Sequence, residues 1–95
     1  MTMKMEDDTM EATNLVLLLV RAMVAAPDGV SVSSSLSSSG STIIQIKVPR
    51  GNDMGKVIGR QGRTAQSLRV IVQAIGRERG KDYKLDIEES STDTK

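Results

Sequence analysis

The first strong hydrophobic pattern in the chain has the period of an α-helix. Apolar residues recur at i, i+3, i+4, i+7, i+8 and i+11, namely at Leu15, Leu18, Leu19, Ala22, Met23 and Ala26. Such a stripe lies along one face of a helix and packs on an apolar surface. Asp8 and Glu11 have the spacing of a capping box, which predicts that the helix begins near Asp8. Pro27-Asp28-Gly29 favours a turn and should end the helix.

A second apolar row runs along the same predicted helix, at Val16, Val20 and Val24. It widens the apolar surface, so it indicates either a helix buried deeply in its own domain or an additional contact with a partner subunit. Residues 1–8 are polar, and we expect them to form a flexible N-terminus.

Two segments further along the chain alternate apolar and polar residues, which is the pattern of half-buried strands. Residues 43–48 read Ile-Ile-Gln-Ile-Lys-Val, and residues 83–88 read Tyr-Lys-Leu-Asp-Ile-Glu. Around Val30 and Val32 the alternation is weaker, because serines occupy most of the following positions. This part predicts a short or edge strand, with a mobile loop over 33–41 as the alternative.

The segment between these two strands predicts two helices separated by a pair of glycines. Asn52 or Asp53 has a side chain suited to cap a short helix over residues 54–58. After Gly62, the Thr64 hydroxyl is suited to cap a longer helix. The glycines therefore lie at an abrupt turn from one helix into the next.

The longer helix carries its own core stripe, formed by Leu68, Ile71, Val72 and Ile75. Gly76 indicates close packing or an early end of this helix, and Gly80 is the expected residue just beyond its last turn. The order is thus α-β-β-α-loop-α-β. A sheet with one apolar face needs a cover, which three amphipathic helices provide, so we predict a two-layer α+β domain over 9–88 with a polar tail over 89–95.

Composition narrows the chemistry that this domain can perform. The chain of 95 residues has no cysteine and no histidine, which removes disulfides, thiol and imidazole catalysis and the usual zinc ligands. Its acids lie in the expected termini and caps, so we predict neither an enzyme nor a bound cofactor. One tyrosine is the only aromatic residue, which argues against RNA recognition on aromatic platforms. The apolar run from Leu15 to Val20 is too short to span a membrane, and we expect an untargeted cytoplasmic protein.

Charge is strongly segregated along the sequence. Residues 43–81 hold nine basic and two acidic side chains, whereas 1–42 and 82–95 each hold two basic and five acidic ones. The basic part surrounds the paired glycines, which favours a polyanionic partner.

The paired glycines, Gly59 and Gly62, have the properties of a phosphate clamp. A residue without Cβ permits a sharp reversal and lets a ligand backbone approach the main chain closely. The free amides and positive dipole end of the following helix attract phosphate. Lys56, Arg60 and Arg63 add positive charge around the same point.

The ten residues from Gly55 to Thr64 read GKVIGRQGRT. This run, placed between two helices after a β-hairpin, resembles the GKVIGxxGRT signature of bacterial KH domains, and the element order resembles the type II arrangement. The chain from about Leu15 to Glu88 is similar to the KhpA family of small bacterial single-KH-domain RNA-binding proteins. The resemblance implies a mixed sheet, a groove for single-stranded RNA beside the GxxG loop, and pairing with itself or with a larger KH-domain protein. The serine-rich segment 33–41 departs from the family's usual sequence.

The resemblance also implies roles for individual residues. The two glycines would bracket the clamp, Arg60 and Gln61 would face the sugar-phosphate backbone, and Ile58 would line the base-binding groove. The predicted RNA-binding residues are Lys56, Ile58, Gly59, Arg60, Gln61, Gly62, Arg63, Thr64 and Arg69. By contrast, Val57, Leu68 and Val72 are assigned to the core.

The sequence leaves more than one functional interpretation. The main one is a non-catalytic single-stranded RNA binder that acts as a post-transcriptional regulator or RNA chaperone. The alternative is an interaction module that dimerises or docks on another protein, with RNA binding weak or secondary, and the wide apolar surface of the first helix supports it. A DNA-reading helix-turn-helix would also use a basic second helix, but it leaves the GxxG loop and the sheet unexplained.

Overall fold

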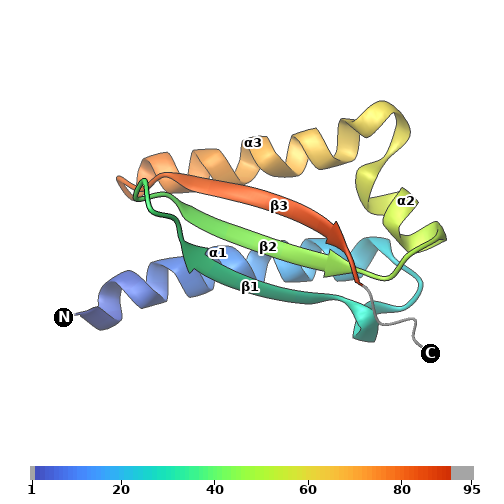
Figure 1. The fold of residues 1–95 in the computed structure, drawn as a ribbon, viewed down its shortest axis with the longest axis horizontal. Helices are drawn as coiled ribbons and strands as arrows, with labels where there is room; N and C mark the ends of the chain where they lie inside the picture. The colour runs from blue at the N-terminus through green and yellow to red at the C-terminus, as the bar shows by residue number, and fades with distance from the viewer. Residues whose placement is uncertain (1, 91–95) are drawn as a thin grey trace.

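The chain folds as a three-stranded sheet with its helices packed against one face (Figure 1). The computed structural model describes residues 2–90, with side chains from residue 9 onward. The elements are α1 (Thr2–Met23), η1 (Pro27–Gly29), β1 (Ser31–Leu36), β2 (Thr42–Val48), α2 (Asn52–Ile58), η2 (Arg60–Gly62), α3 (Arg63–Glu78) and β3 (Tyr83–Glu89). The predicted element order and α+β class are confirmed.

The sheet is mixed, as the resemblance implied. β2 lies in the centre, antiparallel to β1 and parallel to β3. Alternate residues of β2 point into the helical layer, where Ile44, Ile46 and Val48 are fully buried. The opposite face of the sheet is polar, since Gln45 on β2 hydrogen-bonds to Asp86 on β3.

The serine-rich segment forms a full edge strand rather than a mobile loop. All six residues of β1 pair with β2, from Ser31 opposite Lys47 to Leu36 opposite Thr42. Only Val32 of β1 is half-buried, and the other residues of the strand are exposed. The prediction of a short or edge strand is therefore confirmed over Ser31–Leu36, and only the turn that follows it is a loop.

The predicted core face of α1 is only partly correct, because Leu19 and Met23 pack on the core but do not form its main buried row. Val16 and Val20 are 1% and 0% exposed, whereas Leu18 is 66% exposed. The buried row continues backward through Ala12, so it has the i, i+4, i+8 spacing of one helix face. This row is the one we assigned either to deep burial or to a partner, and deep burial is correct.

α3 follows its predicted stripe with one exception. Leu68 and Val72 are buried, and Ile75 packs on the core, but Ile71 is 42% exposed on the outer side of the helix. The four predicted residues spread over a wider part of the helix circumference than the part of α3 that contacts the sheet. Ile71, at the border of the stripe, therefore remains in solvent.

Both glycines near the end of α3 have clear structural roles. A Cβ on Gly76 would lie 2.8 Å from the Lys81 carbonyl oxygen and 3.1 Å from the Tyr83 Cβ, so close packing explains this residue. Gly80 has φ +69° and follows the helix as predicted. The amide of Gly80 donates to Arg77 O at 3.2 Å and that of Lys81 to Gly76 O at 2.8 Å, which is the Schellman pattern of a helix C-terminus.

The chain ends differ from the prediction in one respect. α1 begins at Thr2, so the predicted start near Asp8 is wrong, because residues 2–8 contain no proline or glycine that would stop the helix. The flexible N-terminus over 1–8 and the polar tail over 89–95 stay predictions, and residues 91–95 lie outside the described part. Within residues 2–90, no helix is long and apolar enough to cross a membrane.

Candidate nucleic-acid interface

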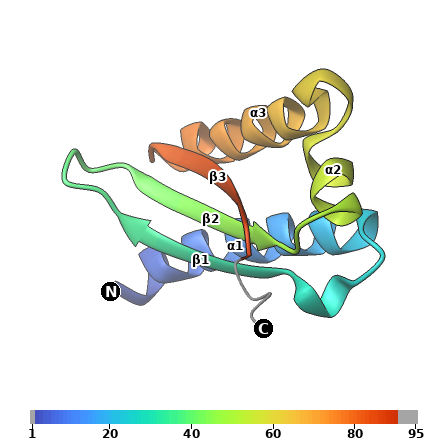
Figure 2. The same ribbon diagram turned by 45° about the vertical axis from the view of Figure 1, so that its right-hand side comes forward.

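The turn from α2 into α3 stands at one end of the molecule, and the β1–β2 hairpin lies at the other (Figures 1 and 2). α2 ends where the Gly59 amide donates to Gly55 O at 2.8 Å. A single 3₁₀ turn over Arg60–Gly62 then closes with the Gly62 amide donating to Gly59 O at 3.1 Å. The four residues Gly59 to Gly62 thus reverse the chain, as the sequence predicted.

Three of these four residues have positive φ. Gly59 has φ 79° and ψ 172°, and Gly62 has φ 75° and ψ 13°. Gln61, between them, has φ 58° and is the one non-glycine residue with positive φ among those described. L-residues adopt such conformations at a cost of about 1–2 kcal/mol, so this turn is held by the residues around it.

Thr64 holds the loop by packing rather than by capping. The N-cap of α3 is Gly62, and no side chain accepts a capping hydrogen bond there, so the predicted Thr64 cap is wrong. A Cβ on Gly59 would lie 2.6 Å from the Thr64 Cβ and 2.9 Å from the Thr64 nitrogen. Gly59 is therefore required both for its backbone angles and for the close approach of Thr64.

Asp53 also differs from its predicted capping role. Gly51 is the N-cap of α2, with no side-chain hydrogen bond. The Asp53 carboxylate instead accepts hydrogen bonds from the Ala25 amide at 2.9 Å and the Ala26 amide at 3.0 Å. It thereby fixes α2, and the loop that follows, to the segment after α1. A carboxylate is suited both to cap a helix and to accept hydrogen bonds from distant amides, so the sequence could not distinguish the two roles.

Electrostatics around Asp53 favour its ionised form. The hydrogen bond from the Ala25 amide is the largest cause that lowers the pKa of Asp53, and the Ala26 amide and the Lys56 charge act in the same direction. Burial opposes them but does not reverse the shift. The Lys56 ammonium lies 3.9 Å from Asp53 Oδ1 with its side chain half exposed, so this is a weak surface ion pair.

The structure brings most of the predicted site residues to one surface. Arg60, Gln61 and Arg63 are exposed on and beside the turn, and among the described residues their side chains form no hydrogen bond or ion pair. Ile58 is half-buried at the end of α2, one residue before the turn. These side chains are free to contact a ligand without breaking an internal interaction.

Arg69 is the predicted residue that the structure separates from the others. It is half-buried on α3, six residues beyond Arg63. At about 100° per residue, this spacing places Arg69 on a different side of the helix. Its assignment to the RNA site stays a prediction.

The start of α3 completes the site. The helix has 16 residues, and its first amides point toward the turn, with no side chain capping them. They carry the positive end of the helix dipole and can donate to a phosphate. The turn therefore combines amide donors with exposed guanidinium groups, which suits a phosphodiester chain.

Comparison with known proteins agrees with this geometry. The sequence-family model of the KhpA/KhpB KH domain matches residues 13–87 of this chain. The chain is 42% identical over 69 residues to the RNA-binding protein KhpA of Streptomyces coelicolor, covering 73% of this chain and 81% of that protein. It is 41% identical over 73 residues to KhpA of Caldanaerobacter subterraneus, covering 77% of this chain and 95% of that protein.

Solved structures support the fold. Era from Aquifex aeolicus bound to GDP.AlF4- superposes with a TM-score of 0.56 at 16% identity, over 85% of this chain and 31% of the Era chain. A second Era structure, in complex with MgGDPNP and 16S ribosomal RNA nucleotides, gives 0.55 at 17% identity, over 82% and 29%. The chain thus corresponds to under a third of Era. With the family match over most of its length, this protein belongs to the KhpA/KhpB KH-domain family.

Proposed function

We propose that this protein is a non-catalytic single-stranded RNA binder that holds the RNA backbone at its GxxG loop and acts as a post-transcriptional regulator or RNA chaperone. Relatives at about 40% identity are named RNA-binding proteins, and the family domain covers the loop. The observation that supports the loop as the site is its exposed, internally unbonded Arg60, Gln61 and Arg63 beside the uncapped start of α3.

In this proposal the backbone and the side chains have separate tasks. The amides at the start of α3 and the two arginines contact phosphates, while Gly59 and Gly62 keep the main chain bare enough for close approach. Ile58 contacts the bases, and a KH groove of this type holds about four nucleotides. Phosphate contacts carry little sequence information, so one domain alone gives modest selectivity.

A pair of double variants tests the site. Arg60→Asp with Gln61→Asp reverses the loop's charge, and Arg77→Asp with Gln73→Asp makes the same changes on exposed positions of α3 beyond the loop. We expect both variants to fold, as judged by circular dichroism and urea unfolding, and only the loop variant to lose binding to a single-stranded RNA oligonucleotide. RNA binding retained by the folded loop variant would contradict the assignment.

Salt dependence provides an independent measurement. If three phosphates are neutralised, log K for the wild type falls with log salt at a slope of about −2, at ~0.7 per single-strand contact. The Arg77 and Gln73 control keeps this slope. A wild-type affinity that does not change with salt would instead support the protein-docking alternative.

The outer surface of α3 supports a second role, self-association. Val70 and Ile71 are 50% and 42% exposed, and the exposed small residues Ser67 and Ala74 continue the surface at i, i+3, i+4 and i+7. This spacing forms one stripe, and its small residues allow another helix to approach closely. We infer that two copies pair antiparallel along this stripe.

Charge complementarity favours a second copy as the partner. Arg63 and Glu78, at the two ends of α3, lie equally far from the midpoint between Val70 and Ile71. In an antiparallel pair, Arg63 of each copy therefore lies opposite Glu78 of the other, which gives two symmetric ion pairs worth at most about 1 kcal/mol each.

Sedimentation tests this contact. Arg63→Glu or Glu78→Arg alone places like charges opposite one another and should weaken the dimer, whereas the double exchange should restore it. Val70→Glu should abolish it. Single and double exchanges with equal dimer constants would contradict the proposed antiparallel arrangement, and a wild-type monomer at all concentrations would remove the dimer altogether.

A further inference from the structure

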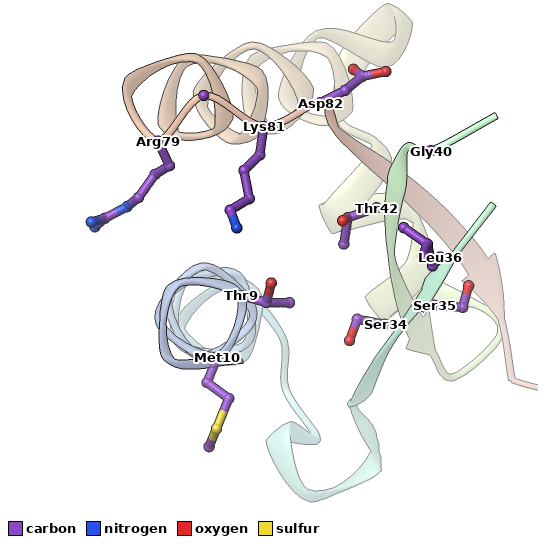
Figure 3. A pocket seen from close by; sticks show the side chains of 11 residues that line it. Thr9, Met10, Ser34, Ser35, Leu36, Gly40, Thr42, Arg79, Lys81 and Asp82 are labelled. Atoms are coloured by element: carbon purple, nitrogen blue, oxygen red, sulfur yellow. The ribbon is translucent and has the colours of Figure 1, made fainter. Parts of the chain in front are cut away.

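The end of the molecule opposite the GxxG loop carries an open groove of about 930 Å³. Its walls come from α1, from the end of β1 with the β1–β2 hairpin, and from the segment between α3 and β3 (Figure 3). None of the predicted RNA-binding residues lines it. A volume of this size accommodates several amino-acid side chains.

The edge of β1 runs directly into this groove. β1 pairs with β2 on one side only, and no other strand of residues 2–90 pairs with its free side. Alternate residues of an edge strand direct their backbone N–H and C=O groups outward, where a further strand can bind. Residues 31–36 contain no charged residue, proline or glycine, the features by which proteins usually protect a free edge.

The groove also has an apolar side and a cationic side. Leu36 is 74% exposed at the end of β1, and Met10 is 57% exposed on α1. Figure 3 shows the Lys81 side chain directed toward α1, while Asp82 points away from the groove. Arg79 forms an ion pair with Glu11 at 2.9 Å, whereas the Lys81 ammonium forms no ion pair with a described residue.

From these observations we propose that the β1 edge and its groove bind an extended peptide segment of a partner protein. The segment adds a fourth strand beside β1, places an aliphatic side chain against Leu36, and brings a carboxylate to Lys81. Backbone pairing supplies affinity, and the side chains that enter the groove supply selectivity. Because the Lys81 side chain is directed toward α1 and that of Asp82 points away, the groove favours an acidic segment over a basic one.

Serines on the two faces of β1 provide a matched pair of variants. Ser34 lines the groove and Ser33 does not, and both are exposed. Ser34→Glu places a carboxylate in the groove, where it repels the acidic segment, whereas Ser33→Glu places the same charge on the same strand at a position that does not line the groove. Both changes have the same effect on net charge and on strand propensity.

The probe is the acetylated peptide Thr-Val-Thr-Val-Thr-Leu-Glu, titrated into the full-length isotope-labelled protein and followed by backbone amide shifts. We expect saturable shifts over β1 and the Lys81 segment, and about tenfold weaker binding to Ser34→Glu and to Lys81→Glu than to Ser33→Glu. A peptide methylated on alternate backbone nitrogens should bind weakly, because it cannot pair with the edge.

Other outcomes would overturn the proposal. No saturable shift up to about 1 mM peptide, or equal affinities of Ser33→Glu and Ser34→Glu, would show that the groove is not a peptide site. Loss of self-association in Ser34→Glu would assign the edge to a second copy, and RNA competing for the same amide shifts would assign it to nucleic acid. RNA binding at the GxxG loop is measured separately and should be unchanged in Ser34→Glu.

Discussion

Gly59→Ala and Gly62→Ala test the construction of the loop, because the two glycines differ in their surroundings. At Gly62, φ 75° and ψ 13° fall in the left-handed helical region, and a Cβ would have no atom of another part of the chain within 4 Å. Alanine there should cost about 1–2 kcal/mol of unfolding free energy through the backbone alone. At Gly59, φ 79° and ψ 172° lie in a region that is essentially restricted to glycine, at about 1–3 kcal/mol for other residues.

The Gly59 variant has a steric cost in addition, since its Cβ would lie 2.9 Å from the Thr64 nitrogen. We therefore expect Gly59→Ala to lose about 3 kcal/mol or more, measured by urea unfolding with an unchanged m-value. In thermal unfolding, each 1 kcal/mol corresponds to about 4–8 °C for a domain of this size. Thr64→Ala should rescue Gly59→Ala only in part, because it removes the nearest atom, Thr64 Oγ1, but leaves the Thr64 nitrogen and Cβ in place. Equal costs at the two glycines, or full rescue by Thr64→Ala, would refute the packing argument.

Three further predictions concern the framework that holds the loop. Because the pKa of Asp53 is lowered in the fold, its carboxylate stabilises the protein above its ordinary pKa of 3.8, and this stabilisation is lost as pH falls through the lower folded value. The unfolding free energy of Asp53→Asn should lack that acid dependence. If Asp53→Asn and the wild type show the same pH profile of stability, the prediction is contradicted. Gly76→Ala should destabilise the fold by about 1–3 kcal/mol through overpacking. Gly55→Ala, with open space around the added Cβ, should instead stabilise it by about 0.5–1 kcal/mol. Urea midpoints that shift in the same direction in both variants would contradict this contrast. Val20→Ala should cost about 2 kcal/mol and Leu18→Ala less than about 0.5 kcal/mol, and the reverse order would contradict the observed face of α1.

Local patterns predicted the elements well because each depended on neighbours in sequence. The alternation over 43–48 and 83–88 required only a sheet with one buried face, and both strands are present. The face of α1 could not be predicted in the same way. Residues 15–20 are apolar all around the helix, so periodicity allowed two rows, and the larger leucines suggested the wrong one. The i, i+4 continuation to Ala12 was the available signal.

The contacts of the site that join residues far apart in the chain could not be predicted from the sequence. Gly59 and Gly62 could be located from their spacing and charge, but the approach of Thr64 to Gly59 depends on how α3 leaves the turn. Asp53 binds amides 27 and 28 residues away, although its position before a helix is equally suited to a cap. In both cases the residue type indicated that the position was important, but the residue that it contacts could not be predicted, because tertiary packing determines that contact.

Arg63 links the two proposed surfaces of α3, and this sharing couples RNA binding to self-association. It stands next to Gly62 in the loop, and it is the residue that would face Glu78 of a second copy. A guanidinium engaged by a carboxylate contributes less to a phosphate contact, so the dimer should bind RNA more weakly at the loop than the monomer does. Linkage then requires RNA to weaken the dimer by the same factor. The slope of log K against log salt separates the two states. A dimer that withholds one phosphate contact per site should show a slope less steep by about 0.7 than the monomer at high dilution. The Glu78→Ala variant should bind RNA with the monomer's slope at every protein concentration, because it frees Arg63 without changing the loop.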